Sequence, residues 1–88
     1  MRKIERTGQF KRDYKRESKG QYSKVLDVAL LDVLELILAS KPLPAKYRDH
    51  PLSGDWSDHR DCHLKPDLLL IYRLPDAQTL QLVRLGSH

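Results

Sequence analysis

The sequence predicts an α+β domain in which two N-terminal helices pack on an antiparallel sheet of three to four C-terminal strands. Residues 9–38 place apolar side chains at helical spacing, whereas residues 60–85 contain short apolar runs separated by turn residues. Hairpin spacing between these runs favours antiparallel pairing. With 88 residues, the chain can build one modest core, so residues 1–88 are expected to form a single domain.

The first helix is predicted over residues 9–19. Phe10 and Tyr14 recur at helical spacing on one side, Thr7 is expected to cap the start, and Gly20 is expected to stop the helix. A second side of the helix carries basic residues: Lys11, Arg12, Lys15, Arg16 and Lys19. This helix therefore buries two aromatic rings and displays a cationic stripe.

The second helix has the strongest pattern in the sequence. Its apolar residues recur at i, i+1, i+4 and i+5: Val25, Leu26, Ala29, Leu30, Val33, Leu34 and Ile37. Ser23 is expected to cap its start, and Leu31 and Leu38 are expected to widen its buried face. Pro42 and Pro44 end the helix, because neither can donate a backbone hydrogen bond.

Four segments are candidates for strands. Residues 3–6 could form an edge strand, residues 60–64 a polar one, and residues 79–85 a strand that begins with clean alternation. The continuous apolar run at residues 67–73 predicts a strand covered on both faces. Residues 74–78 form the turn between the last two strands.

Polar side chains are concentrated in residues 49–67, which contain three of the four histidines and five of the twelve acidic residues. Histidines beside carboxylates can exchange protons near neutral pH. If residues 60–64 are a strand, Asp61 and His63 point together, away from Cys62 and Leu64. A three-residue loop or a bulge would also bring Asp67 to the face of His63, whereas a two-residue loop would separate them.

The net charge of +4 is uneven along the chain. Residues 1–20 carry eight basic and three acidic side chains, which suggests RNA or DNA as a partner, although a solvated helix explains the charge equally well.

The single Cys62 excludes an internal disulfide and suits a reducing compartment. No signal peptide is visible, and acidic residues interrupt the apolar segment at 25–39, so we expect a soluble cytoplasmic protein that does not enter a membrane.

Each polar residue also has a purely structural interpretation. His59 is expected to be a surface residue, His50 could hold its loop by a hydrogen bond, and Asp61 could pair with Arg60 or with a backbone amide. Zinc binding is a further alternative, but the sequence has no H-E-x-x-H motif and no cysteine pair. At the end of the chain, Arg84 and His88 share strand parity.

Three motifs resemble one family in order and spacing. They are D-H-P-L-x-G-x-W at residues 49–56, R-D-x-H-x-x-P-D at residues 60–67 and R-x-G-[ST]-H at residues 84–88. Together with residues 41–44 and 70–72, they are similar to the YafQ branch of the RelE-like bacterial toxins. The resemblance runs from about residue 8 to the end of the chain and implies helices packed against a curved antiparallel sheet.

The resemblance also implies a function. Such toxins cleave messenger RNA in the ribosomal A site and are held inactive by a cognate antitoxin, so the implied partners are that antitoxin and a ribosome with bound mRNA. The positions matching the catalytic set are His50, Asp61, His63, Asp67 and His88, with Arg84 as a phosphate contact. The cationic stripe on the first helix is expected to bind RNA or to accept an acidic segment of the antitoxin, and no metal or other cofactor is expected. The alternative is a basic RNA-binding or antitoxin-partner module without catalytic activity.

Overall fold

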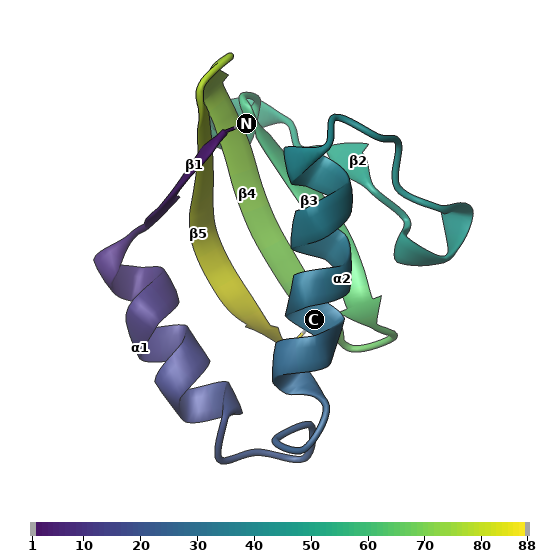
Figure 1. Cartoon of the computed structure of the whole chain (residues 1–88). Coiled ribbons are helices and arrows are strands. Elements are labelled where there is room, and N and C mark those ends of the chain that lie inside the picture. The colour runs from purple at the N-terminus through teal and green to yellow at the C-terminus, as the bar shows by residue number, and fades with distance from the viewer. Residues whose placement is uncertain (1, 88) are drawn as a thin grey trace.

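The computed structural model describes residues 2–87. Its elements run in the order β1 (Lys3–Arg6), α1 (Gly8–Glu17), α2 (Leu26–Leu38), η1 (Ala45–Tyr47), β2 (His50–Pro51), η2 (Gly54–Trp56), β3 (His59–Lys65), β4 (Leu68–Asp76) and β5 (Thr79–Ser87). The two α-helices precede most of the sheet in sequence and pack against it (Figure 1), which confirms the predicted α+β class. Within residues 2–87, no helix has the length and apolar character needed to cross a membrane.

The sheet has five strands in the order β1-β5-β4-β3-β2. Strands β2 to β5 pair antiparallel, which confirms the predicted antiparallel sheet of three to four C-terminal strands, and β1 adds a fifth strand that runs parallel to β5. The edge strand expected at residues 3–6 is confirmed as β1. It lies parallel because the chain leaves β1 through both helices instead of through a hairpin. Strand β2 has only two residues, too few for a periodic signal.

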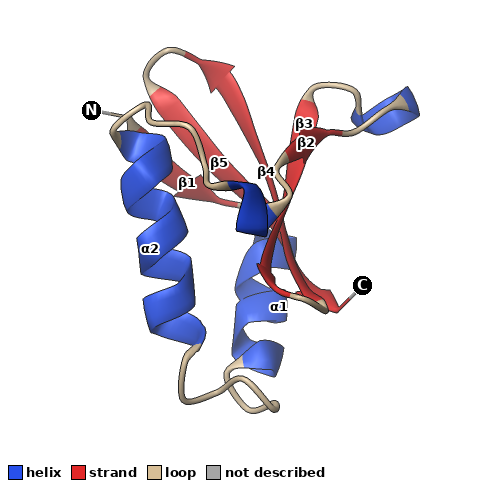
Figure 2. Cartoon of the chain, turned by 90° about the vertical axis from the view of Figure 1, so that its right-hand side faces the viewer, coloured by secondary structure: helices blue, strands red, loops and turns tan. Residues whose placement is uncertain are grey.

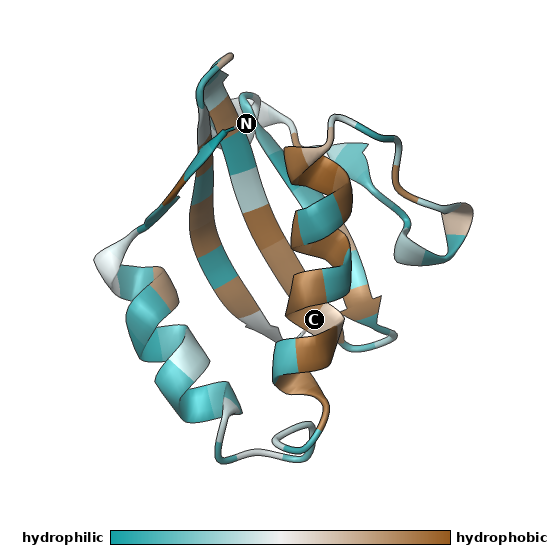
Figure 3. Cartoon of the chain, viewed as in Figure 1, coloured by the Kyte–Doolittle hydropathy of each residue, from teal (hydrophilic) through white to brown (hydrophobic). Residues whose placement is uncertain are grey.

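The core lies between the helices and one face of the sheet. On that face, Cys62 pairs with Leu70, and Leu70 pairs with Leu85. All three are buried, and the helices cover them with Phe10, Leu26, Leu30, Val33 and Ile37. Figure 3 shows α2 as largely hydrophobic and α1 as largely hydrophilic. Burial of this single apolar layer is the main stabilising contribution available to so small a domain.

The helix ends differ in how well they follow the predicted signals. Thr7 caps α1 as expected, since its hydroxyl accepts a hydrogen bond of 3.0 Å from the Phe10 amide. The helix ends at Glu17, before the predicted end at residue 19 and before Gly20. The predicted Ser23 cap of α2 is wrong, because the helix begins at Leu26 without a side-chain cap.

Two predictions of burial are also wrong. Val25, at the N-terminal end of α2, and Leu31 do not belong to the buried face of the helix, because they are 41% and 55% exposed. On β4, Leu70 is buried but Leu69 and Ile71 are only half-buried, so one face of the strand lacks a complete cover. Figure 2 shows why: α2 lies on one side of the sheet, whereas the η2 loop and the end of β5 lie toward the other. The second face of the sheet is therefore not covered by the helices and is available for a functional site.

A buried carboxylate joins α1 to β5. Asp13 is fully buried and accepts hydrogen bonds from Gln9 Nε2 (2.8 Å), Arg16 Nη1 (3.1 Å), Arg84 Nε (3.0 Å) and the Leu85 amide (3.0 Å). Burial acts to raise the pKa of Asp13, but the hydrogen bonds from the Leu85 amide, Gln9 and Arg84 outweigh it and lower the pKa below its ordinary value of 3.8. Asp13 is therefore ionised at neutral pH.

Removal of this carboxylate should destabilise the protein. We expect Asp13→Ala to lower the free energy of unfolding by about 1–3 kcal/mol in urea titrations, because it leaves buried donors without an acceptor. Glu35→Ala is the control, since it removes the same charge from an exposed position on α2.

The loss should depend on pH in a defined direction. The folded state lowers the pKa of Asp13, so its stabilising contribution is present above the ordinary pKa of 3.8 and is lost as the pH falls through the lower folded value. The difference between wild type and Asp13→Ala should therefore shrink below about pH 4. A difference that is constant with pH, or equal to that of the control, would contradict this role.

Candidate active site

A row of paired residues crosses four strands on the open face of the sheet. His50 pairs with Asp61, Asp61 with Ile71, and Ile71 with Arg84. Residues paired directly share a face of the sheet. Neighbouring strands lie about 4.8 Å apart, so the row spans about 14 Å from His50 to Arg84. Three of the predicted site residues thus share one surface, although they lie far apart in sequence.

A second row runs beside the first. His63 pairs with Leu69, and Leu69 pairs with Gly86. These residues are two positions along each strand from the first row, a displacement of about 7 Å. The prediction that Asp61 and His63 share a face away from the core is confirmed by this register.

The hairpin between β3 and β4 contains a bulge, which is one of the arrangements considered from the sequence. The strands pair Lys65 with Leu68 and His63 with Leu69, with a register shift between His63 and Lys65. His63 therefore does not pair with Asp67, as a three-residue loop would have required. Asp67 instead lies in the turn.

Asp67 is bound by the connection between the helices. Its carboxylate accepts hydrogen bonds from the Tyr22 hydroxyl and from Gln21 Nε2, the latter at 3.1 Å. The hydrogen bond from Tyr22 is the main reason that the pKa of Asp67 lies below its ordinary value. Asp67 is therefore ionised at neutral pH and can accept a proton or a hydrogen bond but cannot donate one.

His50 is held between a backbone carbonyl and Asp61. Its Nδ1 lies 2.6 Å from the Arg48 carbonyl oxygen, so the hydrogen-bonding role predicted for His50 in its loop is confirmed. A carbonyl only accepts, so Nδ1 is the donor and Nε2 is directed to Asp61 Oδ2 at 3.8 Å. Asp61 Oδ1 is buried and has no hydrogen-bond partner within residues 2–87. Asp61 is thus placed to orient the imidazole.

Asp49 anchors the segment that carries His50. Its carboxylate accepts hydrogen bonds from Arg60 Nη2 at 3.0 Å and from the Tyr72 hydroxyl at 2.7 Å. Arg60 therefore pairs with Asp49, and the suggested pair of Arg60 with Asp61 is wrong. Burial and the contact with Asp49 raise the pKa of Tyr72, which keeps its hydroxyl protonated as a donor. Sequence reasoning missed this anchor because nothing local indicates that Tyr72 faces Asp49.

Cys62 lies directly behind the site but takes no part in it. It is fully buried in the core. Burial, together with the negative charges of Asp49 and Asp61, raises the pKa of its thiol to about 12. The thiol is therefore protonated at neutral pH and acts as a packing residue.

Within residues 2–87, no three potential metal-ligating side chains gather into a group that could hold a metal ion.

A hollow of about 390 Å³ opens at the β5 end of the first row. It is lined by residues that include Arg16, Trp56, Leu69, Ile71, Arg84 and Gly86. Arg84 donates a hydrogen bond from Nε to Asp13. Within residues 2–87 its two terminal nitrogens, Nη1 and Nη2, make no hydrogen bond, so they can bind an anion. No local pattern indicated that Asp13, on the first helix, would orient this arginine.

Arg16 lines the same hollow but is more fully engaged. Its guanidinium donates to Asp13, to Glu17 and to the Leu85 carbonyl oxygen. Gly86 permits this approach, because a Cβ at that position would lie 2.9 Å from Arg16 Nη2. Arg16 therefore braces α1 against β5 at the edge of the hollow.

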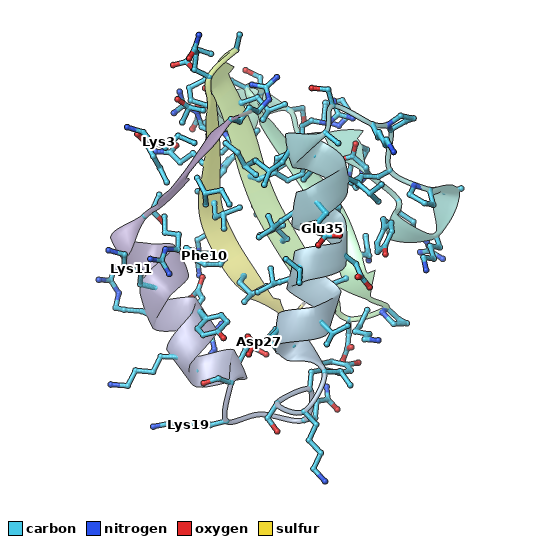
Figure 4. All side chains as sticks on the ribbon, in the orientation of Figure 1. Lys3, Phe10, Lys11, Lys19, Asp27 and Glu35 are labelled. Carbon is cyan, nitrogen blue, oxygen red and sulfur yellow. The ribbon has the colours of Figure 1, made fainter. Side chains whose placement is uncertain are left out.

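The predicted cationic stripe faces more than one way. Lys11 lines a separate groove between α1 and α2, whereas Arg16 lines the hollow on the sheet. Arg12 and Lys15 are exposed along α1, and Lys19 lies beyond its end. In Figure 4, Lys11 and Lys19 project outward from the molecule. RNA binding by this set stays a prediction.

The structure tests the prediction made for His59 but not the one made for His88. The prediction that His59 is a surface residue is wrong, because its side chain is only 14% exposed. Its ring makes a T-shaped contact with Trp56 at 4.8 Å between centroids. His88, together with its predicted alignment with Arg84, lies outside the described residues.

Comparison with known proteins agrees with the motifs and the geometry. The family model described as the bacterial toxin of type II toxin-antitoxin system, YafQ, matches residues 2–88. The mRNA interferase toxin YafQ of Escherichia coli K12 is 42% identical over 90 residues, which cover 100% of this chain and 92% of the relative.

Solved structures are similar over the whole fold. The toxin in the crystal structure of the E. coli DinJ-YafQ toxin-antitoxin complex superimposes with a TM-score of 0.83 at 40% identity, covering 99% of this chain and 92% of that one. A metal-bound toxin from Helicobacter pylori gives a TM-score of 0.81 at 42% identity, covering 100% and 96%. The chain therefore belongs to the YafQ family of bacterial type II toxins.

Proposed function

We propose that this protein is an endoribonuclease that cleaves messenger RNA in the ribosomal A site, without a metal ion, and that a cognate antitoxin holds it inactive. The observation that supports the proposal is the row from His50 and Asp61 to Arg84, in which an imidazole, a carboxylate and a guanidinium share one open face of the sheet. The relatives named mRNA interferase toxins, and the DinJ-YafQ complex, support the substrate class and the kind of partner.

The proposed reaction is an attack of the ribose 2′-OH on the adjacent phosphorus. A bond forms between the 2′ oxygen and phosphorus while the bond to the 5′ oxygen breaks, which leaves a 2′,3′-cyclic phosphate and a 5′-OH. One group must remove the 2′ proton, another must protonate the departing oxygen, and cations must stabilise the additional phosphoryl charge.

The residues can be assigned to these roles in pairs. His88 is proposed as one proton-transfer group and His63, with Asp67, as the other. The low pKa of Asp67 suits a carboxylate that orients an imidazole or accepts a proton, and not a general acid. His50, oriented by Asp61, would assist phosphate binding or proton transfer, and Arg84 would neutralise phosphoryl charge.

A second candidate function is RNA or antitoxin binding without chemistry. The exposed cations of α1 favour it, since phosphate contacts alone give sequence-independent affinity. Primer-extension mapping of transcripts after brief expression in growing bacteria separates the two functions. New 5′ ends within codons support cleavage, whereas ribosome binding without new ends supports the binding module.

The histidines should be essential for cleavage. We expect His63→Ala and His88→Ala each to reduce cleavage of ribosome-bound mRNA by at least about 100-fold, the usual contribution of a proton-transfer group. Gln78→Ala is a suitable control because Gln78 is exposed in the turn between β4 and β5. Urea titrations should show that both histidine variants remain folded. Near-normal cleavage by both would defeat the assignment.

Cleavage should also be insensitive to removal of transition metals. A chelator selective for zinc and copper, which leaves the Mg²⁺ that ribosomes require, should not change the cleavage rate. The products should carry a 2′,3′-cyclic phosphate and a 5′-OH. Loss of activity that added Zn²⁺ restores, or a 5′-phosphate on the product, would instead indicate metal-assisted hydrolysis.

A further inference from the structure

Trp56 stands at the edge of the hollow on the open face of the sheet. It belongs to η2 and is 40% exposed, although it is a large aromatic residue. It lines the same hollow as Leu69 and Ile71, which are half-buried, and as Arg84. The proton-transfer chemistry described above uses none of the apolar groups in this hollow.

The loop that carries Trp56 is held by a backbone hydrogen bond, a left-handed glycine and a ring contact. The Leu52 amide donates to the His59 carbonyl oxygen at 3.0 Å, which closes the loop where β2 meets β3. Gly54 adopts a φ of +68°, a left-handed conformation that favours glycine, as the chain enters η2. The indole then meets the His59 ring at an interplanar angle of 64°. These contacts orient the ring without covering it.

The chemistry of the hollow selects its occupant. It combines an exposed indole and an aliphatic floor with two arginines, and no described residue that lines it is acidic. Arg84 keeps its terminal nitrogens available beside this apolar surface. A nucleotide matches both properties, because its base offers an apolar π face and its phosphate offers a negative charge.

The floor of the hollow lies in the same two rows of paired residues as the candidate catalytic side chains. Ile71 in its floor lies between Asp61 and Arg84 in the first row, and Leu69 lies between His63 and Gly86 in the second. Adjacent rows are only about 7 Å apart. A base in the hollow would therefore belong to a nucleotide next to the scissile phosphate.

We propose that Trp56 is the platform on which one nucleobase of the mRNA stacks, above the floor formed by Leu69 and Ile71, while the neighbouring phosphate binds Arg84. This inference rests on the proposed function and adds to it a base-binding site that contributes affinity and codon preference. Stacking of this kind accepts any base but favours those with the largest π surface.

The test measures binding without requiring cleavage. Ribosomes are programmed with mRNA whose A-site codon carries 2′-O-methyl groups, so the 2′-OH cannot attack. We expect Trp56→Ala to raise the Kd for these ribosomes about tenfold, the usual effect of losing one stacked base, and Trp56→Phe to restore most of the affinity. Leu74→Ala is the matched control, because Leu74 is 39% exposed and does not line this hollow.

An abasic nucleotide identifies the stacked base. At one codon position, removal of the base should raise the Kd of the wild-type protein by a similar factor but leave the Kd of Trp56→Ala unchanged. Equal effects of the abasic position on both proteins would overturn the proposal, and so would an equal loss of affinity in Leu74→Ala. Unfolding curves of the variants show whether folding accounts for any loss.

Two further measurements separate the possible failures. If the wild-type protein binds but does not cut unmodified mRNA, the proposed nuclease function fails while the stacking result stands. If Trp56→Ala instead weakens binding of the cognate antitoxin and keeps full affinity for the ribosome, the hollow is a protein-docking site and the base-binding proposal is overturned.

Discussion

The buried carboxylate of Asp13 is the interaction on which both the fold and the open face depend. It ties α1 to β5 through the Leu85 amide and binds Arg16 and Arg84 at the same time. A buried charge is costly unless its hydrogen-bonding capacity is filled, and here four donors fill it. One residue on a helix thereby sets the position of an arginine on a strand, on the face where RNA is proposed to bind.

The sheet has one face that packs against the single core and one face that the helices leave open. The helices cover one face, where the row of Cys62, Leu70 and Leu85 is buried. The other face displays a row that starts at His50 and ends at Arg84. Because side chains alternate along a strand, the residues that build the core and those that build the candidate site are interleaved in sequence. Packing of the core therefore positions the site directly behind it.

The polar loop before β3 depends on its own anchor. Asp49 is bound by Arg60 and Tyr72, so the short strand β2 is fastened to β3 and β4. His50 follows immediately and is held by the Arg48 carbonyl. Trp56 comes next, oriented by His59. A loop built mostly of polar residues thus presents its functional side chains on a rigid support, as sites of this kind require.

The sequence by itself determined the helices, the last two strands, the joint orientation of Asp61 and His63, and the family. Periodicity reports which side of an element faces the core, and the motifs at residues 49–67 and 84–88 preserve the spacing of a known site. Both are local properties that need no knowledge of distant contacts.

Tertiary structure alone decided the parallel pairing of β1, the open face of β4, the bulge that separates His63 from Asp67 in register, and the partial burial of His59. It also decided that Asp13 would bind Arg84, 71 residues later in the chain. Each of these depends on a partner distant in sequence. Local patterns describe how polar or apolar a face is, but only the packed chain selects which side chains meet.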